Sequence, residues 1–128
     1  MLLYDISPRF CETDAMGHIN NTVLPMWFEA ARGAIFELFN PGQDLSKWNL
    51  ILRKIDVDYL AQTSYEHPAQ VRTRIGHVGS SSFVVEHELW QEGELTVRGS
   101  AVMIFYDYGA QQKRTIPPEI RAELQKLG

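Results

Sequence analysis

The sequence predicts an α+β domain in which one antiparallel sheet bends around a long buried helix. Three observations lead to this fold class. Apolar residues recur at helical spacing between residues 22 and 40. After residue 48 the apolar period changes to two, and it stays near two as far as residue 106. Short turn signals separate these alternating runs, as in antiparallel hairpins. With 128 residues the chain has room for one domain, residues 1–128.

The first predicted elements are a strand over residues 4–10, a polar loop over residues 11–21 and the long helix. The helix is expected from Thr22 to Asn40, because Pro25 is tolerated in a first turn and Asn40-Pro41-Gly42 ends it. Its side chains are apolar nearly all round, which is the pattern of a buried helix. One sheet cannot cover so many sides, so we expect a second copy of the chain to pack against it.

Four further strands and a short C-terminal helix are predicted. The strands show alternating apolar residues over residues 55–59, 71–75, 83–90 and 95–106. Gly79-Ser80-Ser81 and Glu92-Gly93-Glu94 are short enough to close antiparallel hairpins. The last helix is expected over residues 117–127, with proline at its start and leucines at helical spacing.

Composition excludes several classes of protein. A net charge of −4 argues against a dedicated nucleic-acid-binding protein, which usually carries a basic surplus. Cys11 is the single cysteine, so an internal disulfide and a cysteine-rich zinc site are excluded. No apolar run could cross a bilayer and no signal peptide is recognisable, so we expect a cytoplasmic protein without a membrane partner. The histidine spacing and the absence of a phosphate-binding loop predict no metal and no cofactor.

The tract from Arg9 to Asn21 carries the highest density of reactive side chains. It joins the first strand to the start of the buried helix, where free N–H groups and the helix dipole stabilise an oxyanion. A carboxylate just before that point, Asp14 or Glu12, could act as nucleophile or general base. Gly17 would let the backbone approach a ligand closely. A structural alternative stays open, in which Asp14 caps a turn and Asn20-Asn21 cap the helix.

The tract R-F-x-E-T-D-A-M-G-H-I-N-N at residues 9–21, followed by W-F-E-x-A-R at residues 27–32, resembles the 4-hydroxybenzoyl-CoA thioesterase family of hotdog-fold acyl-CoA thioesterases. The likeness extends to I-D-V-D-Y at residues 55–59, the turn at residues 79–83 and Ile116-Pro117. It implies a five-stranded antiparallel sheet, in the order 1-3-4-5-2, wrapped around a long central helix. It also implies that two protomers pair their sheets with the active site between them.

The resemblance further implies a function and the residues that perform it. The expected activity is hydrolysis of an acyl-CoA to a free acid and CoA, without a cofactor, by a homodimer or homotetramer. Asp14 matches the family's catalytic aspartate, and Asn21 falls where a backbone N–H polarises the thioester carbonyl. The serine turn is implied to meet the pantetheine and phosphate end of CoA, and the basic pair its nucleotide phosphates. The positions implied to bind substrate are Gly17, His18, Asn20, Ser80, Ser81, Ser82, Lys113 and Arg114.

Three alternatives stay open at this point. A hotdog dehydratase acting on hydroxyacyl thioesters would need a catalytic histidine with an acidic partner, and His18 is the candidate. A non-catalytic module that binds acyl thioesters would keep the fold and lack turnover. A different hotdog branch uses a helix carboxylate for catalysis, a role that Glu29 would fill unless it pairs with Arg32 three residues later.

Overall fold

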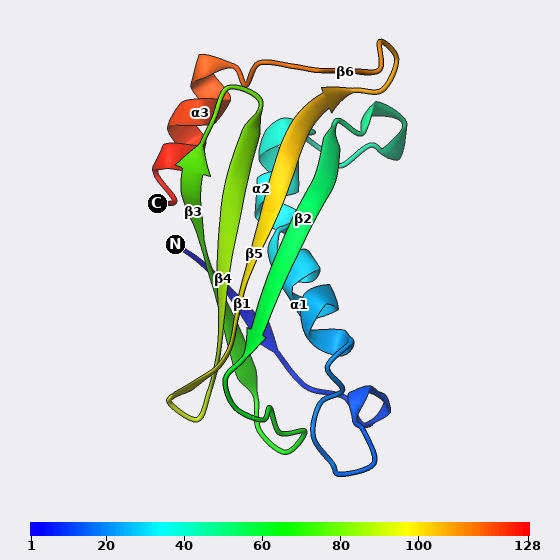
Figure 1. Ribbon diagram of the computed structural model, residues 1–128, viewed down its shortest axis with the longest axis vertical. Coiled ribbons are helices and arrows are strands. Elements are labelled where there is room, and N and C mark those ends of the chain that lie inside the picture. Colours follow the sequence, from blue (N-terminus) through cyan, green and yellow to red (C-terminus); the bar gives the residue numbers. More distant parts are fainter.

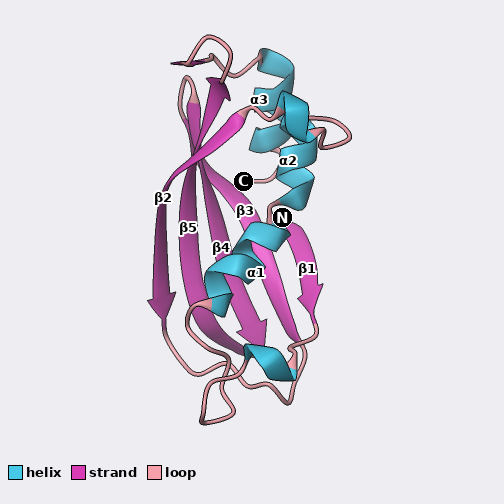
Figure 2. Cartoon of the chain, turned by 90° about the vertical axis from the view of Figure 1, so that its right-hand side faces the viewer, coloured by secondary structure: helices cyan, strands magenta, loops and turns pink.

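The computed structural model describes all residues 1–128, which form one curled antiparallel sheet with helices on a single face (Figures 1 and 2). The strand order is β1-β3-β4-β5-β2, as the resemblance implies, and the short β6 pairs with β5. The helices are too short or too polar to span a membrane. The elements are β1 (Leu2–Ile6), α1 (Val23–Ala31), α2 (Gly33–Phe39), β2 (Leu50–Tyr59), β3 (Ala69–Val78), β4 (Ser82–Gln91), β5 (Glu94–Asp107), β6 (Gln112–Lys113) and α3 (Pro118–Gln125).

The first strand begins and ends earlier than predicted. Strand β1 stops at Ile6, so the prediction of a strand over residues 4–10 is wrong for its second half. Pro8 has no N–H to donate to a neighbouring strand. Residues 10–12 form a 3₁₀ turn instead, and the Arg9 N–H donates to the Glu12 carboxylate at 2.7 Å.

The helix predicted as one piece from Thr22 to Asn40 is two shorter helices, α1 and α2, divided at Arg32. Arg32 has φ −84° and ψ −1°, and its N–H donates to the Glu29 carbonyl three residues back. Gly33 follows, and glycine is a poor helix former. The Arg32 side chain is buried and contacts His87 of the sheet, so it forms no ion pair with Glu29.

The core lies between the sheet and the helices in two apolar clusters. Gly99 on β5 allows α1 to approach closely, because a Cβ at this position would lie 2.7 Å from the Phe28 ring. The cluster around α1 contains Ile6, Ile19, Val23, Leu24, Trp27, Phe28, Ala31, Ala69, Val71, Leu89 and Val97. The cluster around α2 and α3 contains Ile35, Phe39, Leu50, Ile75, Phe83, Val85, Ala101, Met103, Phe105, Ile116 and Leu124.

Strand β2 is a free edge of the sheet, and it carries a bulge at Arg53. The register with β5 shifts between Leu52 and Lys54. Even-numbered residues such as Leu52 face the helices before the bulge, and odd-numbered residues such as Ile55 face them after it. Several side chains on that face lack a covering element: Leu52 is 45% exposed, Ile55 45% and Tyr59 50%. A free edge strand with exposed apolar side chains on one face is a natural surface for pairing with another chain.

Candidate active site

Asp14 lies in a tight loop between the 3₁₀ turn and α1. Its N–H donates to the His18 carbonyl at 2.7 Å, and Gly17 turns the chain at φ 79°, a conformation that favours glycine. The carboxylate oxygen Oδ1 accepts from the N–H groups of Met16 at 2.8 Å and His18 at 3.2 Å. Oδ2 accepts no hydrogen bond, and the residue is exposed. One oxygen therefore fixes the carboxylate while the other is free to react.

The start of α1 presents an unbonded N–H group at Asn21. The Thr22 N–H and hydroxyl donate to the Asn20 side-chain oxygen at 2.9 and 2.8 Å, and the Val23 N–H donates to the Asn20 carbonyl at 3.0 Å. The Asn20 side chain therefore closes an Asx turn just before α1, whereas the N-cap residue is Thr22, so the expectation that Asn20-Asn21 cap the helix is wrong. The Asn21 N–H has no acceptor in the chain and lies at the positive end of the helix.

Asp14 and Asn21 line the same pocket, which has a volume of about 550 Å³. Leu24 and Tyr59 also line it. The Tyr59 hydroxyl donates to the Asn21 carbonyl at 2.6 Å and so joins the end of β2 to the start of α1. Sequence reasoning missed Tyr59 as a site residue, because 38 positions separate it from Asn21 and no local pattern connects the two.

Glu12, the other acidic candidate in this tract, is a structural anchor. It is 7% exposed, and its carboxylate accepts from the Trp27 indole N–H at 2.8 Å and from the Arg9 N–H at 2.7 Å. Burial raises the pKa of Glu12, but the hydrogen bonds from Trp27 and Arg9 outweigh it and hold that pKa below its ordinary value. Both carboxylate oxygens are occupied, so Glu12 ties the loop to α1.

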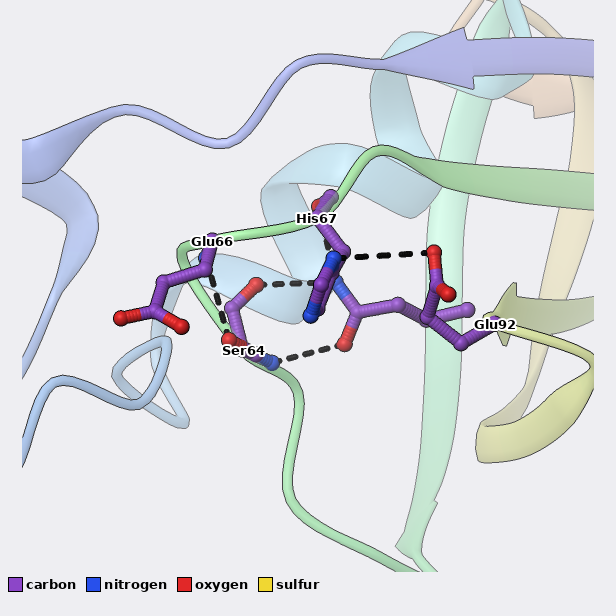
Figure 3. A network of polar contacts seen from close by, with 5 residues as sticks. Ser64, Glu66, His67 and Glu92 are labelled. Carbon is purple, nitrogen blue, oxygen red and sulfur yellow. Dashed lines mark hydrogen bonds and ion pairs between the residues drawn. The ribbon is translucent and has the colours of Figure 1, made fainter.

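A second loop supports the Asp14 loop from the side of the sheet. His18 forms an isolated β-bridge with Ser64. The buried Gln91 fixes this second loop, because its side chain accepts from the Ser64 N–H at 2.7 Å and donates to the carbonyls of Ser64 and His67 at 2.8 and 2.9 Å (Figure 3). The rigid β4 end thereby holds the loop that positions Asp14.

The residues implied to bind CoA lie at the opposite end of the molecule. Ser80, Ser81 and Ser82 form the turn between β3 and β4, beside α3, whereas the Asp14 loop lies beyond the far end of the sheet (Figure 1). Lys113 is on β6 and is exposed. One chain by itself therefore does not bring the two sets of predicted site residues together.

Two arginines shape this opposite end. The Arg114 guanidinium lies over the Phe105 ring, 4.4 Å from its centroid. Arg121 of α3 donates to the Gly79 carbonyl at 2.7 Å and holds the serine turn. Sequence reasoning missed Arg121, since its contact is with a carbonyl 42 residues away. Lys113 and Arg114 are both exposed at this end.

The alternative catalytic groups have other surroundings. Glu29 is exposed, lies along α1 and is absent from the lining of the Asp14 pocket. His18 has no acidic partner, and the one histidine that faces a carboxylate is His67, 3.6 Å from the exposed Glu92 (Figure 3). No group of three or more histidine, cysteine or acidic side chains is placed to hold a metal. The geometry therefore favours Asp14 among the candidates.

The sequence profile of the thioesterase-like superfamily matches residues 8–124. The chain belongs to this superfamily. Its structure is similar to that of a predicted thioesterase from Bacillus stearothermophilus, with 35% identity and a TM-score of 0.95 over 98% of this chain and 95% of that one. A Thermus thermophilus thioesterase, complexed with coenzyme A and Zn, is 27% identical with a TM-score of 0.86 over 97% of both chains. The uncharacterized YsmA of Bacillus subtilis is 32% identical over 101 residues, 77% of this chain and 68% of YsmA. The protein is a hotdog-fold thioester hydrolase.

Proposed function

We propose that this thioesterase hydrolyses acyl-CoA thioesters to a free acid and CoA, with residues 1–128 acting as one catalytic domain. The observation that carries the proposal is the Asp14 carboxylate, which has one oxygen held by two N–H groups and the other free. It shares its pocket with the unbonded Asn21 N–H. The coenzyme A complex of the Thermus relative supports CoA as the thiol part of the substrate.

In the proposed reaction the thioester carbonyl oxygen accepts a hydrogen bond from the Asn21 N–H. One such donor stabilises the tetrahedral intermediate by about 3–4 kcal/mol. Two routes fit the geometry: Asp14 Oδ2 attacks the carbonyl carbon, or it takes a proton from a water molecule that attacks. In both routes the C–S bond breaks as the intermediate collapses, and its electron pair leaves on the CoA sulfur. In the first route a water molecule then hydrolyses the mixed anhydride formed with Asp14, which releases the free acid and regenerates the carboxylate. A thiolate is a good leaving group, so no separate general acid is required.

Gly17, His18 and Asn20 complete the proposed reaction site. Gly17 turns the loop, and the His18 N–H orients the carboxylate of Asp14. The Asn20 side chain holds the turn before α1 through the Thr22 N–H, and the neighbouring Asn21 N–H is left free. These three residues hold the two reacting groups in a fixed relation, which is the main requirement for an efficient site.

We further propose that the active site is completed by a partner subunit in a homodimer. Two copies of β2 that pair antiparallel around a two-fold axis reverse the direction of the sheet. The end of one protomer that carries Asp14 then lies level with the opposite end of its partner. Lys113 and Arg114 of the partner subunit, with its Ser80–Ser82 turn, would meet the CoA phosphates. The exposed Leu52 and Ile55 on β2 support pairing at this edge.

A thiol-release assay with purified protein and CoA esters of aromatic, short, medium and long acids tests the function. We expect turnover of at least one class. Tight binding of acyl-CoA with no thiol released from any ester would support the non-catalytic binding module instead.

Mixed dimers test whether the site is shared. Asp14→Asn and the double variant Lys113→Ala, Arg114→Ala are each expected to have low activity under subsaturating substrate. A heterodimer of the two would contain one intact site, made of Asp14 from one chain and the basic pair from the other. We expect mixing and subunit exchange to restore activity. No gain on mixing, with heterodimers detected by native mass spectrometry, would place all these groups in a single subunit's site.

A further inference from the structure

A buried polar cluster lies where α1 and α2 meet, away from the Asp14 pocket. It consists of Arg32 between the helices, His87 on β4 and Thr73 on β3, which are 4%, 1% and 1% exposed. Arg32 Nη1 lies 3.2 Å from His87 Nε2, and Thr73 Oγ1 lies 2.9 Å from His87 Nδ1. The imidazole is stacked on the Phe28 ring with centroids 4.8 Å apart.

The cluster contains a buried cation that no carboxylate contacts directly. Arginine has no acceptor atom, so Nε2 of His87 must accept from Arg32 and Nδ1–H must donate to Thr73. Burial, and then the charge of Arg32, lower the pKa of His87 to about 3, so the imidazole is neutral. No carboxylate forms an ion pair with Arg32, and its Nε–H is buried with no acceptor. Nη2 also makes no hydrogen bond and, unlike Nε, is not sealed from solvent, so a ligand in the cavity can satisfy it.

Arg32 and His87 line a cavity of about 160 Å³ between α1 and β2. Most of the remaining lining is apolar, including Met26, Phe28 and Ile55. This cavity and the reaction pocket both lie between α1 and β2. Leu24 and Tyr59 line the reaction pocket, and Pro25 and Val57, next to them on the same two elements, line the cavity. A group anchored at Asn21 and extended along α1 would therefore point toward Arg32.

We propose that this cavity receives the distal end of the acyl group, and that Arg32 donates a hydrogen bond from Nη2, which has no partner in the chain, to an uncharged oxygen there, a hydroxyl or a carbonyl. The inference rests on the proposed acyl-CoA hydrolase function. Arg32 is a specificity-determining residue in this account and takes no part in bond breaking.

Charge and distance define the acyl group more closely. Glu29 and Asp56 also line the cavity, so one cation and two carboxylates give a net charge of −1. This negative charge disfavours an acyl group that ends in a carboxylate, so an uncharged hydrogen-bond acceptor is the better partner for Arg32. Asn21 and Arg32 are eleven positions apart, and at helical rise that separation is about 16 Å. The Arg32 side chain leans back toward the helix start, so the acyl group has about 10 Å to span.

Matched CoA esters test this inference with the wild-type protein. The probes are octanoyl-CoA, ω-hydroxyoctanoyl-CoA and the ω-carboxy analogue of the same length, with butanoyl-CoA and ω-hydroxybutanoyl-CoA as the short pair. We expect kcat/KM for the hydroxylated octanoyl ester to exceed that of octanoyl-CoA by about tenfold, the effect of one satisfied buried donor. The carboxylated ester should be the poorest of the three, and the short pair should show no preference.

Variants assign the preference to Arg32. Arg32→Met should reduce the hydroxyl-to-plain ratio to about one, whereas Arg98→Met, at an exposed arginine on β5, should keep it. The readout is a ratio, so a general loss of activity does not count. Equal or faster hydrolysis of octanoyl-CoA by the wild type overturns the inference, even if Arg32→Met does not fold. Preference for the carboxylated ester, or a ratio retained in Arg32→Met, also overturns it. Failure to hydrolyse any CoA ester would contradict the proposed function itself.

Discussion

The Tyr59 hydroxyl donates a 2.6 Å hydrogen bond to the Asn21 carbonyl, and this bond connects the last residue of β2 with the start of α1. Asn21 also carries the free N–H proposed to polarise the substrate carbonyl. Strand β2 is the free edge at which a second copy is proposed to pair. One tyrosine thus links the edge of the sheet to the backbone of the reaction site.

Tyr59→Phe should lower kcat with little change in KM. The phenyl ring keeps the packing, and only the hydrogen bond that holds the Asn21 peptide is lost. A net hydrogen bond of about 1 kcal/mol corresponds to roughly a fivefold loss of rate if it acts on the transition state. Steady-state kinetics measure the split between kcat and KM. A raised KM at wild-type kcat would instead make Tyr59 a substrate-binding residue.

The stability of the protein should fall as the pH drops below about 6.5, because His87 stays neutral in the folded state. Unfolded histidine binds a proton near pH 6.5, whereas the folded pKa of His87 is about 3. Between these values His87 alone lowers the free energy of unfolding by about 1.4 kcal/mol per pH unit. Urea unfolding of the wild type and His87→Gln from pH 7 to pH 4 measures this slope, which should be shallower in the variant. An NMR titration of His87 with a midpoint near 6 would contradict the assignment.

Glu12→Gln should destabilise the protein at neutral pH by about 1–2 kcal/mol, since hydrogen bonds to a carboxylate are stronger than those to an amide. The folded pKa of Glu12 is lowered from 4.5, so its contribution is present above that value and is lost as the pH falls through the folded pKa. Urea midpoints of the variant and the wild type should therefore converge in acid. Equal midpoints at pH 7 would show that the negative charge of Glu12 contributes nothing to stability.

Local periodicity predicts most of the fold, and the departures arise from contacts distant in sequence. The alternation in β3, β4 and β5 is visible because one face of each strand is buried. The break between α1 and α2 at Arg32 is not visible in the sequence, because His87, which the Arg32 guanidinium contacts, is 55 positions away. The bulge at Arg53 is equally hidden, since alternation resumes on both sides of it.

The candidate site divides in the same way. The loop with Asp14 and Gly17 could be predicted because its reactive residues are contiguous, and so could the helix start at Asn21. Tyr59 and Arg121 act through backbone carbonyls of distant segments, and no sequence pattern marks such partners. The distance between the Asp14 loop and Lys113 on β6 could not be predicted from the sequence, because it depends on how the strands are arranged in the sheet (Figure 1).

The double variant Lys113→Ala, Arg114→Ala should raise KM for acyl-CoA more than it lowers kcat, because the phosphates that it contacts are remote from the reacting bond. Wild-type KM should rise with salt, since exposed ion pairs are screened. The variant should show a weaker salt dependence. Both effects are measured by thiol release at several salt concentrations. An unchanged KM in the variant would remove both residues from the CoA site.

The most direct measurement of the central claim is kcat for Asp14→Asn beside Glu29→Gln, each at saturating acyl-CoA. Asparagine keeps an oxygen that can accept from the Met16 and His18 N–H groups, so the loop should persist and the melting temperature should hardly change. Loss of the charge removes the nucleophile or base, and we expect kcat to fall by at least about 10²-fold. Glu29→Gln should retain most of its turnover. Wild-type turnover in Asp14→Asn together with an inactive Glu29→Gln would contradict the account and place the catalytic carboxylate on α1.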